Sequence, residues 1–564
     1  MDSNDRKNSD PVTGEEIKGT FEKAGEKIDS FVDEAGKQVD GMIEEAGIKI
    51  NEAEEKIDAA GEKIDDKVKG SIDAAGEEAG KVIDKIEEDT VEESVEGEGR
   101  KPGVFVSLIP VIVMMGLLLL SLLKFEWDVQ IPLITAAVVA ACIAAWGYKI
   151  PYKTIEQGIF NSIMNAMQAI LIACLIGLII SAWIAGGIVP SLIYYGLKIL
   201  SPRFFLVTCL LVCSIAGIAT GSSWTVAGTI GVAMIGIGVG MGIPAPVTAG
   251  AVISGGYFGD KMSPFSDTTN LAPASAGTTL FAHIRHMVYT TGVSYIIAIV
   301  LFWIVNTRFV SNMTADEGSI TEIMAALKDG FTINPWLMLP VAIIFILIAF
   351  KIPAIPGLVL SVVMGIICAL CFQGVGLASM GDILEWGFTS ETGNAVIDDL
   401  LTRGGLQNMM WTVSLIMCAL TFGGVMFASG MLEAIAVAML RLAKGTGGLI
   451  AVTELTAFVV ILICGEQYLG IILTGKMYKD EYRKRGLAPQ NLSRALEDSG
   501  TLLSPLIPWS TCGVAMSSYL GVATLAYIPY CFLNLVNPLV GLFYGFTGKT
   551  IRKIDEVDPN DIVD

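Results

Sequence analysis

The stretch GVFVSLIPVIVMMGLLLLSLL, residues 103–123, runs through 21 positions without a charged side chain. Because the hydrocarbon core of a bilayer is about 30 Å thick, a helix needs roughly 20 apolar residues to cross it. Similar runs recur at 130–148, 159–185, 204–220, 224–243, 287–307, 335–350, 355–374, 406–432, 448–464 and 520–546, with shorter ones between them. The sequence therefore predicts an all-α polytopic membrane protein with about 11 to 13 transmembrane helices.

The composition of the whole chain agrees with this prediction. Of its 564 residues, 53% are hydrophobic and 17% are charged, and the mean hydropathy is +0.61. The charge is uneven, because residues 1–100 hold 31 Asp and Glu against 14 Lys and Arg, a net of −17 out of −20 for the chain. No nucleic-acid surface is indicated, and the ten cysteines lie in apolar runs without metal-site spacing, so we expect them to pack in the core.

Residues 1–100 form an acidic arm with a repeated Ala-Gly pair. The pair recurs at 24–25, 35–36 and 46–47, an 11-residue step close to three helical turns, and less regularly at 60–61 and 75–76. A membrane-surface helix and a self-associating coil are the functional alternatives. Repeated glycine and negative charge favour a solvated tail, so we expect a partly helical or disordered cytoplasmic arm.

The positive residues of the loops predict the orientation in the membrane. Lys and Arg concentrate on cytoplasmic loops. Here they cluster at 100–101, 149–153, 285, 351, 441–444, 476–494 and 549–553, and acidic loops at 310–330 and 376–400 alternate with them. We therefore expect a multi-pass protein of the prokaryotic cytoplasmic (inner) membrane, with both termini cytoplasmic.

Two halves of the chain align through five short anchors. The pairs are GIFN 158–161 with GLQN 405–408, AGG 185–187 with ASG 428–430, GSSW 221–224 with GEQY 465–468, GIPAP 242–246 with GLAP 486–489, and SP 263–264 with SP 504–505. The fourth anchor is uncharged in the first half but lies within KMYKDEYRKRGLAPQNLSR in the second, so the two copies are predicted to face opposite sides of the membrane. Inverted repeats of this kind occur in many secondary transporters, with the site at the midplane on interrupted helices.

These anchors divide the chain into predicted segments. They are the arm at 1–100, two transmembrane helices at 101–157, inverted repeat 1 at 158–307, linking loops with a helix pair at 308–404, inverted repeat 2 at 405–547, and a cytoplasmic tail at 548–564.

Polar residues enter the predicted membrane region at equivalent places in both halves. In the first half, GDKMSPFSDTTN (259–270) carries Asp260, Ser263, Ser266, Asp267, Thr268, Thr269 and Asn270, and Pro264 and Pro273 interrupt the helix. Carboxylates, hydroxyls and freed carbonyls are the groups that a hard monovalent cation prefers in place of water. We therefore expect Na⁺ at Asp260 and Asp267, where a carboxylate can also exchange the cation for a proton. Lys261 is expected to neutralise Asp260.

The second half offers an opposed set of polar residues. It comprises Glu466, Glu497, Asp498, Ser499, Thr501, Ser504, Ser510 and Thr511, with Glu454 alone in an apolar run. Either Glu454 takes part in transport or its carboxyl is hydrogen-bonded to a neighbouring helix. Another polar interruption carries Thr220, Ser222, Ser223, Trp224 and Thr225, which either line the site or form a polar hinge. His283 and His286 are candidates for a pH sensor, although interfacial anchoring is favoured.

At GDKMSPFSDTTNLAP the sequence resembles the NhaC family of sodium/proton antiporters, a branch of the ion-transporter superfamily. The resemblance covers about residues 103–547 and includes GEQYLGIILTGKMY and EDSGTLLSPLIPWSTCG, but not the acidic arm. It implies electrochemical exchange of Na⁺ for H⁺ by alternating access, with no cofactor beyond the transported ions. No Ser/His/Asp set, P-loop or ATP-binding module is present in the sequence, so we expect no enzyme activity.

The mechanistic hypothesis is that Asp260 and Asp267, with the opposed Glu466/Asp498 region, bind Na⁺ and H⁺ competitively. The family also contains Na⁺- and H⁺-coupled exchangers of malate and lactate, and a cation channel is a third, less favoured alternative. A buried arginine facing the site would favour the organic-acid alternative; Arg403 and Arg441 are the nearest candidates, and both are expected at the interface. The expected partners are the lipid bilayer, Na⁺ and H⁺. A second copy of the chain, in a homodimer, is the protein partner that we consider.

Overall fold

The structure is a computed structural model that describes residues 102–312, 317–349 and 354–563. All of the described residues belong to one compact unit. The predicted acidic arm therefore lies outside the described residues. The described part is built from helices, and its β-pairing is limited to isolated bridges.

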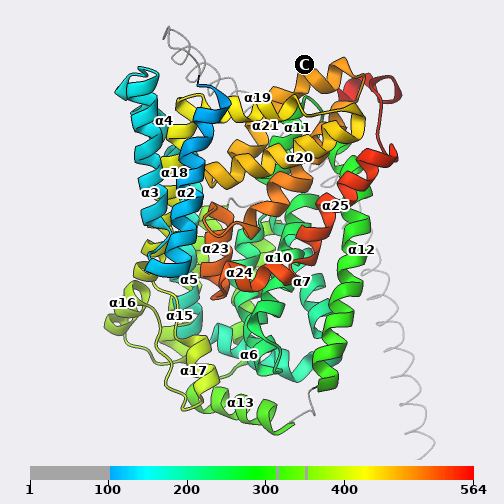
Figure 1. Ribbon diagram of the computed structural model, residues 1–564. Coiled ribbons are helices and arrows are strands. Elements are labelled where there is room, and N and C mark those ends of the chain that lie inside the picture. Colours follow the sequence, from blue (N-terminus) through cyan, green and yellow to red (C-terminus); the bar gives the residue numbers. More distant parts are fainter. Residues whose placement is uncertain (1–101, 313–316, 350–353, 564) are drawn as a thin grey trace, which may run out of the picture. The chain divides into compact units, whose positions relative to one another are not determined.

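The first half of the described chain contains eleven α-helices (Figure 1). They are α2 (Val104–Leu120), α3 (Gln130–Cys142), α4 (Tyr152–Asn165), α5 (Met167–Ala185), α6 (Ile188–Ile199), α7 (Phe205–Thr220), α8 (Ser223–Val226), α9 (Val232–Gly240), α10 (Ala245–Met262), α11 (Asp267–Ala276) and α12 (Leu280–Asn312). A π-helical segment, η4 (Ala227–Gly231), joins α8 to α9.

A linking region and the second half follow. The linking helices are α13 (Glu317–Gly330), α14 (Leu339–Ala349), α15 (Ala354–Phe372), α16 (Leu377–Trp386) and α17 (Ala395–Leu401). The second half contains α18 (Leu406–Ala428), α19 (Met431–Leu440), α20 (Gly445–Cys464), α21 (Gln467–Lys484), α22 (Pro489–Leu496), the π-helical η6 (Glu497–Thr501), the 3-10 turn η7 (Ser504–Leu506), α23 (Thr511–Leu520), α24 (Thr524–Tyr527) and α25 (Phe532–Thr547).

Nine helices among the described residues are long and apolar enough to cross a membrane, and a pair bent by 85° at α23 and α24 would make ten. The protein is thus a multi-pass membrane protein, while the predicted count of 11 to 13 is not confirmed. Two predicted spans are wrong as single helices. The run 159–185 breaks at Ala166 between α4 and α5, and the run 520–546 breaks where Gly521 takes a positive φ of 66° and Pro529 follows.

The two halves share an order of turns and helix caps. Four glycine pairs with positive φ recur in the same order, namely Gly187 with Gly430, Gly221 with Gly465, Gly242 with Gly486, and Gly277 with Gly521. The capped helices match as well. Ser222 caps α8 where Glu466 caps α21, and Ser266 caps α11 where Ser510 caps α23. These pairs of turns and caps lie at offsets of 243 and 244 residues, close to those of the five anchors.

Glycines bring α7 and α10 into backbone contact, and the two helices lie side by side (Figure 1). A Cβ at Gly217 would lie 2.8 Å from the carbonyl oxygen of Gly256 and 2.9 Å from Cα of Gly259. Because larger side chains would hold the helices apart, these glycines allow the end of α10 to reach the start of α8. This contact positions the residues at the end of α10.

The chain after α25 runs back over two interhelical turns. Ile554 N–H donates to the Gly486 carbonyl oxygen at 3.0 Å, between α21 and α22. Val563 N–H donates to the Gly277 carbonyl oxygen at 3.1 Å, between α11 and α12, and the Thr278 hydroxyl donates to the Asp561 carbonyl oxygen at 2.7 Å. The tail therefore contacts one turn from each half.

Candidate functional site

The helix interruption predicted at Pro264 is present between α10 and α11, whereas the interruption predicted at Pro273 is wrong because Pro273 lies inside α11. The helix stops at Met262 and restarts at Asp267. The break leaves carbonyl groups without a helical hydrogen bond, and nearby side chains donate hydrogen bonds to them. Asn270 Nδ2 donates to the carbonyl oxygens of Pro264 at 3.0 Å and Ser266 at 2.7 Å, and Thr269 Oγ1 donates to the Asp260 carbonyl oxygen at 3.2 Å. Ser263, Ser266, Thr269 and Asn270 therefore brace the break.

Asp260 lies at the amino end of α8. Its side chain is 8% exposed, and its Oδ2 accepts hydrogen bonds from Ser223 N–H at 3.1 Å and Ser223 Oγ at 2.7 Å. Ser222 Oγ caps the same helix by accepting from Thr225 N–H at 3.2 Å. These bonds hold the Asp260 carboxyl against the first turn of α8. Asp267, by contrast, is exposed at the first turn of α11, so the two aspartates lie in different surroundings.

The second half places two adjacent carboxyls on η6. π-Helical turns are rare and are frequent at functional sites. Asp498 Oδ1 accepts from Lys261 Nζ at 2.5 Å, from Asn537 Nδ2 at 2.6 Å and from Thr290 Oγ1 at 3.1 Å. Both members of the Lys261–Asp498 ion pair are fully buried. The expectation that Lys261 neutralises Asp260 is therefore wrong, because its ammonium group contacts a carboxylate 237 residues later in the chain.

Glu497 faces the first half but has no direct partner. Its side chain is fully buried, and neither carboxyl oxygen has a hydrogen-bond partner within the described part of the chain. It interacts electrostatically with Lys261 and Asp260, and the hydroxyls of Thr268 and Thr501 lie close by. Glu497 from one half and Asp260 from the other thus belong to the same buried region.

Glu454 lies on α20 beside the Lys261–Asp498 pair. Its carboxyl is buried and has no hydrogen-bond partner among the described residues, so the alternative of a hydrogen-bonded Glu454 is not what the structure has. A Cβ at Gly541 of α25 would collide with Glu454 Oε1 and lie 3.2 Å from Asp498 Oδ2. The absence of a side chain at Gly541 therefore leaves room for both carboxyls.

A buried arginine is present, but neither predicted candidate provides it. Arg441 is exposed, and Arg403 donates to the Leu520 carbonyl oxygen at 3.3 Å, at the carboxyl end of α23. Arg494 of α22 is 2% exposed and interacts electrostatically with Asp498 and Glu454. Arg494 was not among the predicted candidates because it stands at the end of the basic segment 476–494; its spacing of four residues from Asp498 was the signal that could have found it.

The remaining polar residues of the second half make local bonds. Glu466 is buried, and its Oε1 accepts from Tyr468 N–H at 3.2 Å as the cap of α21. Ser504 Oγ donates to the Thr501 carbonyl oxygen at 2.9 Å, and Ser510 Oγ donates to the Ser504 carbonyl oxygen at 2.6 Å. Thr511 begins α23, with its N–H donating to the Gly465 carbonyl oxygen at 2.8 Å. These contacts shape the second break, and they do not bring Glu466 to Asp498.

The two histidines of α12 are buried, so the prediction of interfacial anchoring is wrong. His283 is 0% exposed, and its Nδ1 lies 2.8 Å from Ser493 Oγ of α22. His286 is buried one turn later on α12, and Thr290 on the same helix donates to Asp498. This face of α12 therefore contacts α22 at His283 and the Lys261–Asp498 pair at Thr290.

The buried charges do not balance. Among the described residues of this region the acidic side chains are Asp260, Glu454, Glu466, Glu497 and Asp498, and the basic ones are Lys261 and Arg494. Both basic groups lie beside Asp498 and Glu454. Asp260, Glu466 and Glu497 are thus left without a cation of their own, and a buried carboxyl in that position must bind a proton or a metal cation.

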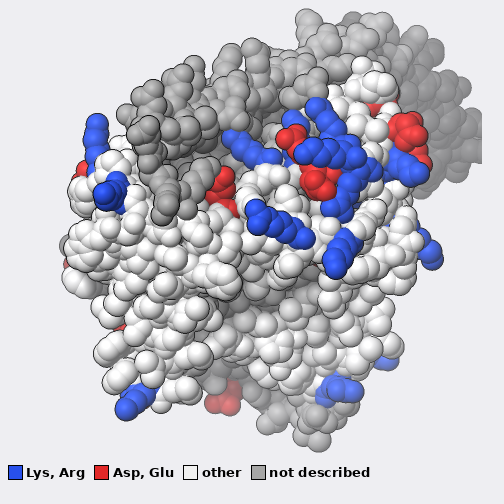
Figure 2. Space-filling view, turned by 45° about the horizontal axis from the view of Figure 1, so that its top comes forward, with Lys and Arg blue, Asp and Glu red and all other residues white. Residues whose placement is uncertain are grey.

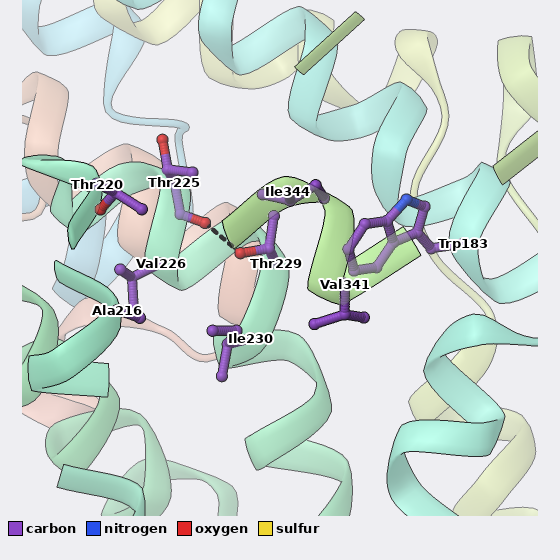
Figure 3. A pocket seen from close by; sticks show the side chains of 9 residues that line it. All are labelled: Trp183, Ala216, Thr220, Thr225, Val226, Thr229, Ile230, Val341 and Ile344. Carbon is purple, nitrogen blue, oxygen red and sulfur yellow. Dashed lines mark hydrogen bonds between the residues drawn. The ribbon is translucent and has the colours of Figure 1, made fainter. Parts of the chain in front are cut away.

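A small pocket opens beside α8 (Figure 3). Its lining residues are Trp183, Ala216, Thr220, Thr225, Val226, Thr229, Ile230, Val341 and Ile344. Thr229 Oγ1 donates to the Thr225 carbonyl oxygen at 2.6 Å, as Figure 3 shows, and Thr225 Oγ1 donates to Ser222 Oγ at 3.1 Å. The hydroxyls on this wall therefore connect to Ser222, the residue before the Ser223 that binds Asp260. No group of three or more His, Cys, Asp or Glu suited to a metal ion occurs among the described residues.

Comparison with known proteins identifies the family. The model of the Na⁺/H⁺ antiporter family matches residues 104–269 and 255–549. The chain is 40% identical to the Na⁺/H⁺ antiporter NhaC of Alkalihalophilus pseudofirmus, over 80% of this chain and 98% of that protein. It is 36% identical to the malate-2H⁺/Na⁺-lactate antiporter of Bacillus subtilis, over 79% of this chain and 96% of that protein.

Two further similarities are more distant. The arginine/ornithine antiporter ArcD of Halobacterium salinarum is 34% identical, over 82% of this chain and 96% of that protein. The solved structure of Neisseria gonorrhoeae MtrF matches with a TM-score of 0.35 and 14% identity, over 74% of this chain and 94% of that one. On the family model and the relatives above 30% identity, this chain is a multi-pass membrane protein that belongs to the Na⁺/H⁺ antiporter family.

Proposed function

We propose that this protein exchanges Na⁺ for H⁺ across the cytoplasmic membrane, with Asp260 and Glu497 as the pair of carboxyls that takes either ion. The observation that carries the proposal is that these two buried carboxyls come from different halves and lack a cation of their own. The hydroxyls of Ser223, Thr268 and Thr501 supply further oxygen ligands near them. Since a proton and Na⁺ neutralise the same charge, the two ions compete, and competition is what antiport requires.

The repeat supports alternating access as the way in which the site is exposed to each side. Equivalent helices α6 and α19 lie toward opposite ends of the view in Figure 1, as expected of inverted copies. In this proposal the α10–α11 break and the η6–η7 break form the two halves of the site. Asp267, exposed at the start of α11, serves as an entry residue rather than a ligand of the buried ion.

The distribution of positive charge supports cytoplasmic termini. Figure 2 turns the top of Figure 1 toward the viewer. It shows Lys and Arg gathered on this end of the protein, where α19 and α21 lie. Arg483 and Lys484 lie in the last turn of α21, and the tail at 548–563 contacts the turn that follows. By the positive-inside rule this face is the cytoplasmic one.

Organic-acid exchange remains the second candidate function because of Arg494. A buried guanidinium is a natural partner for a carboxylate substrate. In this structure, however, Arg494 interacts electrostatically with Glu454 and Asp498, and its Nη1 donates to Thr550 Oγ1 at 3.0 Å. Simple cation exchange is therefore favoured.

The test uses purified full-length protein in liposomes with an imposed proton gradient. Na⁺ added outside should collapse the gradient, whereas choline should not. Malate and lactate, each supplied on one side or on both, should leave the rate of Na⁺-dependent collapse unchanged. A collapse that requires malate or lactate would replace the proposal with organic-acid exchange, and a gradient that is insensitive to Na⁺ under all these conditions would contradict both functions.

A further inference from the structure

The ammonium group of Lys261 lies inside a set of buried oxygen atoms. Its Nζ contacts Asp498 Oδ1, and that oxygen also accepts from Thr290 and Asn537. We propose that this location is a second monovalent-cation site and that the ammonium group of Lys261, which is covalently attached to the chain, occupies it. The protein then binds one Na⁺ from solution, whereas without this ammonium group its buried oxygen atoms would bind two. This inference rests on the proposed function, because it concerns the number of ions bound in the same buried region.

The oxygen atoms around the ion pair are suited to Na⁺. Asp498 Oδ2, Asn537 Oδ1 and both oxygens of Glu454 are buried and have no hydrogen-bond partner within the described ranges. They come from η6, α25 and α20, which pack against one another. Gly541 keeps the space between Glu454 and Asp498 free of a side chain. Carboxylate and amide oxygens are the ligands that hard cations prefer, so this set could coordinate Na⁺ if the ammonium were absent.

Charge explains why the site needs a cation at all. Asp498 and Glu454 approach each other near Gly541, and two carboxylates in a dry interior repel each other strongly. Lys261 contacts Asp498 directly, and Arg494 interacts with both carboxyls from α22. If Lys261 became neutral, one negative charge would remain buried, and leaving a buried charge unpaired is highly unfavourable. A mobile cation would then occupy the vacated position.

The tether distinguishes Lys261 from a transported ion. Lys261 belongs to α10 of the first half and Asp498 to η6 of the second, so the pair joins the two halves without releasing anything to solution. Asp260, the next residue to Lys261, bonds instead to Ser223. Adjacent residues of α10 thus serve two positions, one open to exchange and one filled by the protein itself.

The main experiment measures Na⁺ binding by the purified full chain with radioactive ²²Na⁺. We expect about one Na⁺ per chain for the natural protein and about two for Lys261→Met, with a steeper dependence of transport on Na⁺ concentration. The matched control is the double variant Lys261→Met/Asp498→Asn, which removes both charges and should return to about one Na⁺ per chain. An unchanged ion count in a monodisperse Lys261→Met protein would overturn the inference.

A second measurement, of thermal stability, also applies to a variant that is too unstable for ion counting. Lys261→Ala is extracted in NaCl or in choline chloride, and its melting temperature is compared with that of the natural protein. Because a ligand that binds the folded state stabilises it, NaCl should raise the melting temperature of Lys261→Ala more than that of the natural protein. Aggregation of Lys261→Ala to the same extent in both salts would contradict a Na⁺-accepting site. Absence of Na⁺ binding by the natural protein would instead contradict the proposed function.

Discussion

The two interrupted segments of the protein share a backbone pattern but carry their charges in different places. An offset of 244 residues relates Ser266 to Ser510, and both cap the helix after the break. At this offset, which three of the glycine turns share but the Ser263–Ser504 anchor does not, Asp260 corresponds to Ser504, and Asp498 corresponds to Ser254. At both positions, therefore, one half has a carboxyl where the other half has a hydroxyl. The acidic residues of α10 and η6 thus lie at different positions of the two halves. The turns and caps recur in both halves, whereas the buried carboxyls do not.

The largest effect on transport is expected from neutralising Asp260, the buried carboxyl of the first half. Asp260→Asn should reduce Na⁺-dependent proton transport by about 100-fold or more, as expected when a charged ligand of a buried ion is lost. The equivalent change in the second half, Ser504→Ala, removes neutral hydrogen bonds and should cost less than about 5-fold. Both are measured as initial rates in proteoliposomes at matched protein content. Equal losses in the two variants would mean that the site is symmetric after all.

An intermediate effect is expected at the glycine contact between α7 and α10, which has no close equivalent in the second half. A Cβ at Gly259 would lie 2.5 Å from the carbonyl carbon of Gly217, so Gly259→Ala forces two backbones apart. We expect a loss of stability of about 1–3 kcal/mol, measured by thermal unfolding in detergent. Gly256→Ala on the same helix is the control, because its Cβ would be 3.6 Å from the nearest atom, in Ser223. A control variant that unfolds as readily as Gly259→Ala would show that the close approach of the helices does not matter.

The smallest effect is expected in the region that links the halves, at Asp398 of α17. Backbone N–H of Thr392 donates to this carboxylate at 2.7 Å, and the hydroxyls of Ser390 and Thr392 donate as well, so its pKa is lowered from the ordinary value. A lowered pKa stabilises the folded state above the unfolded pKa near 4, and this stabilisation is lost as the pH falls through the folded pKa.

Asp398→Asn should therefore lower the melting temperature slightly at neutral pH, and the difference from the natural protein should shrink as the pH falls below about 4. Glu391→Gln, a change at an exposed residue of the same loop, is the control for a general charge effect. A difference that stays constant down to pH 3 would show that these hydrogen bonds do not depend on the charge of Asp398.

The sequence by itself determined the features that arise from local composition. Apolar runs such as 103–123 predicted membrane helices, because the bilayer imposes a length and excludes charge. Pro264 predicted the break before α11, since proline acts on the helix within a few positions of itself. Recurrent glycines predicted the repeat, because the same tight turns need the same residue.

Tertiary structure alone decided which buried charges meet. Lys261 stands beside Asp260 in the sequence, yet successive residues of a helix point about 100° apart, so Lys261 reaches Asp498 while Asp260 turns to Ser223. Arg494 belongs to a basic segment of the sequence, but the packing of α11, α12, α20 and α21 around α22 encloses it. Asp267 shares a motif with Asp260 but is exposed, because the break reorients the chain between them. Spacing along the chain cannot determine these pairings, since they depend on how distant helices pack.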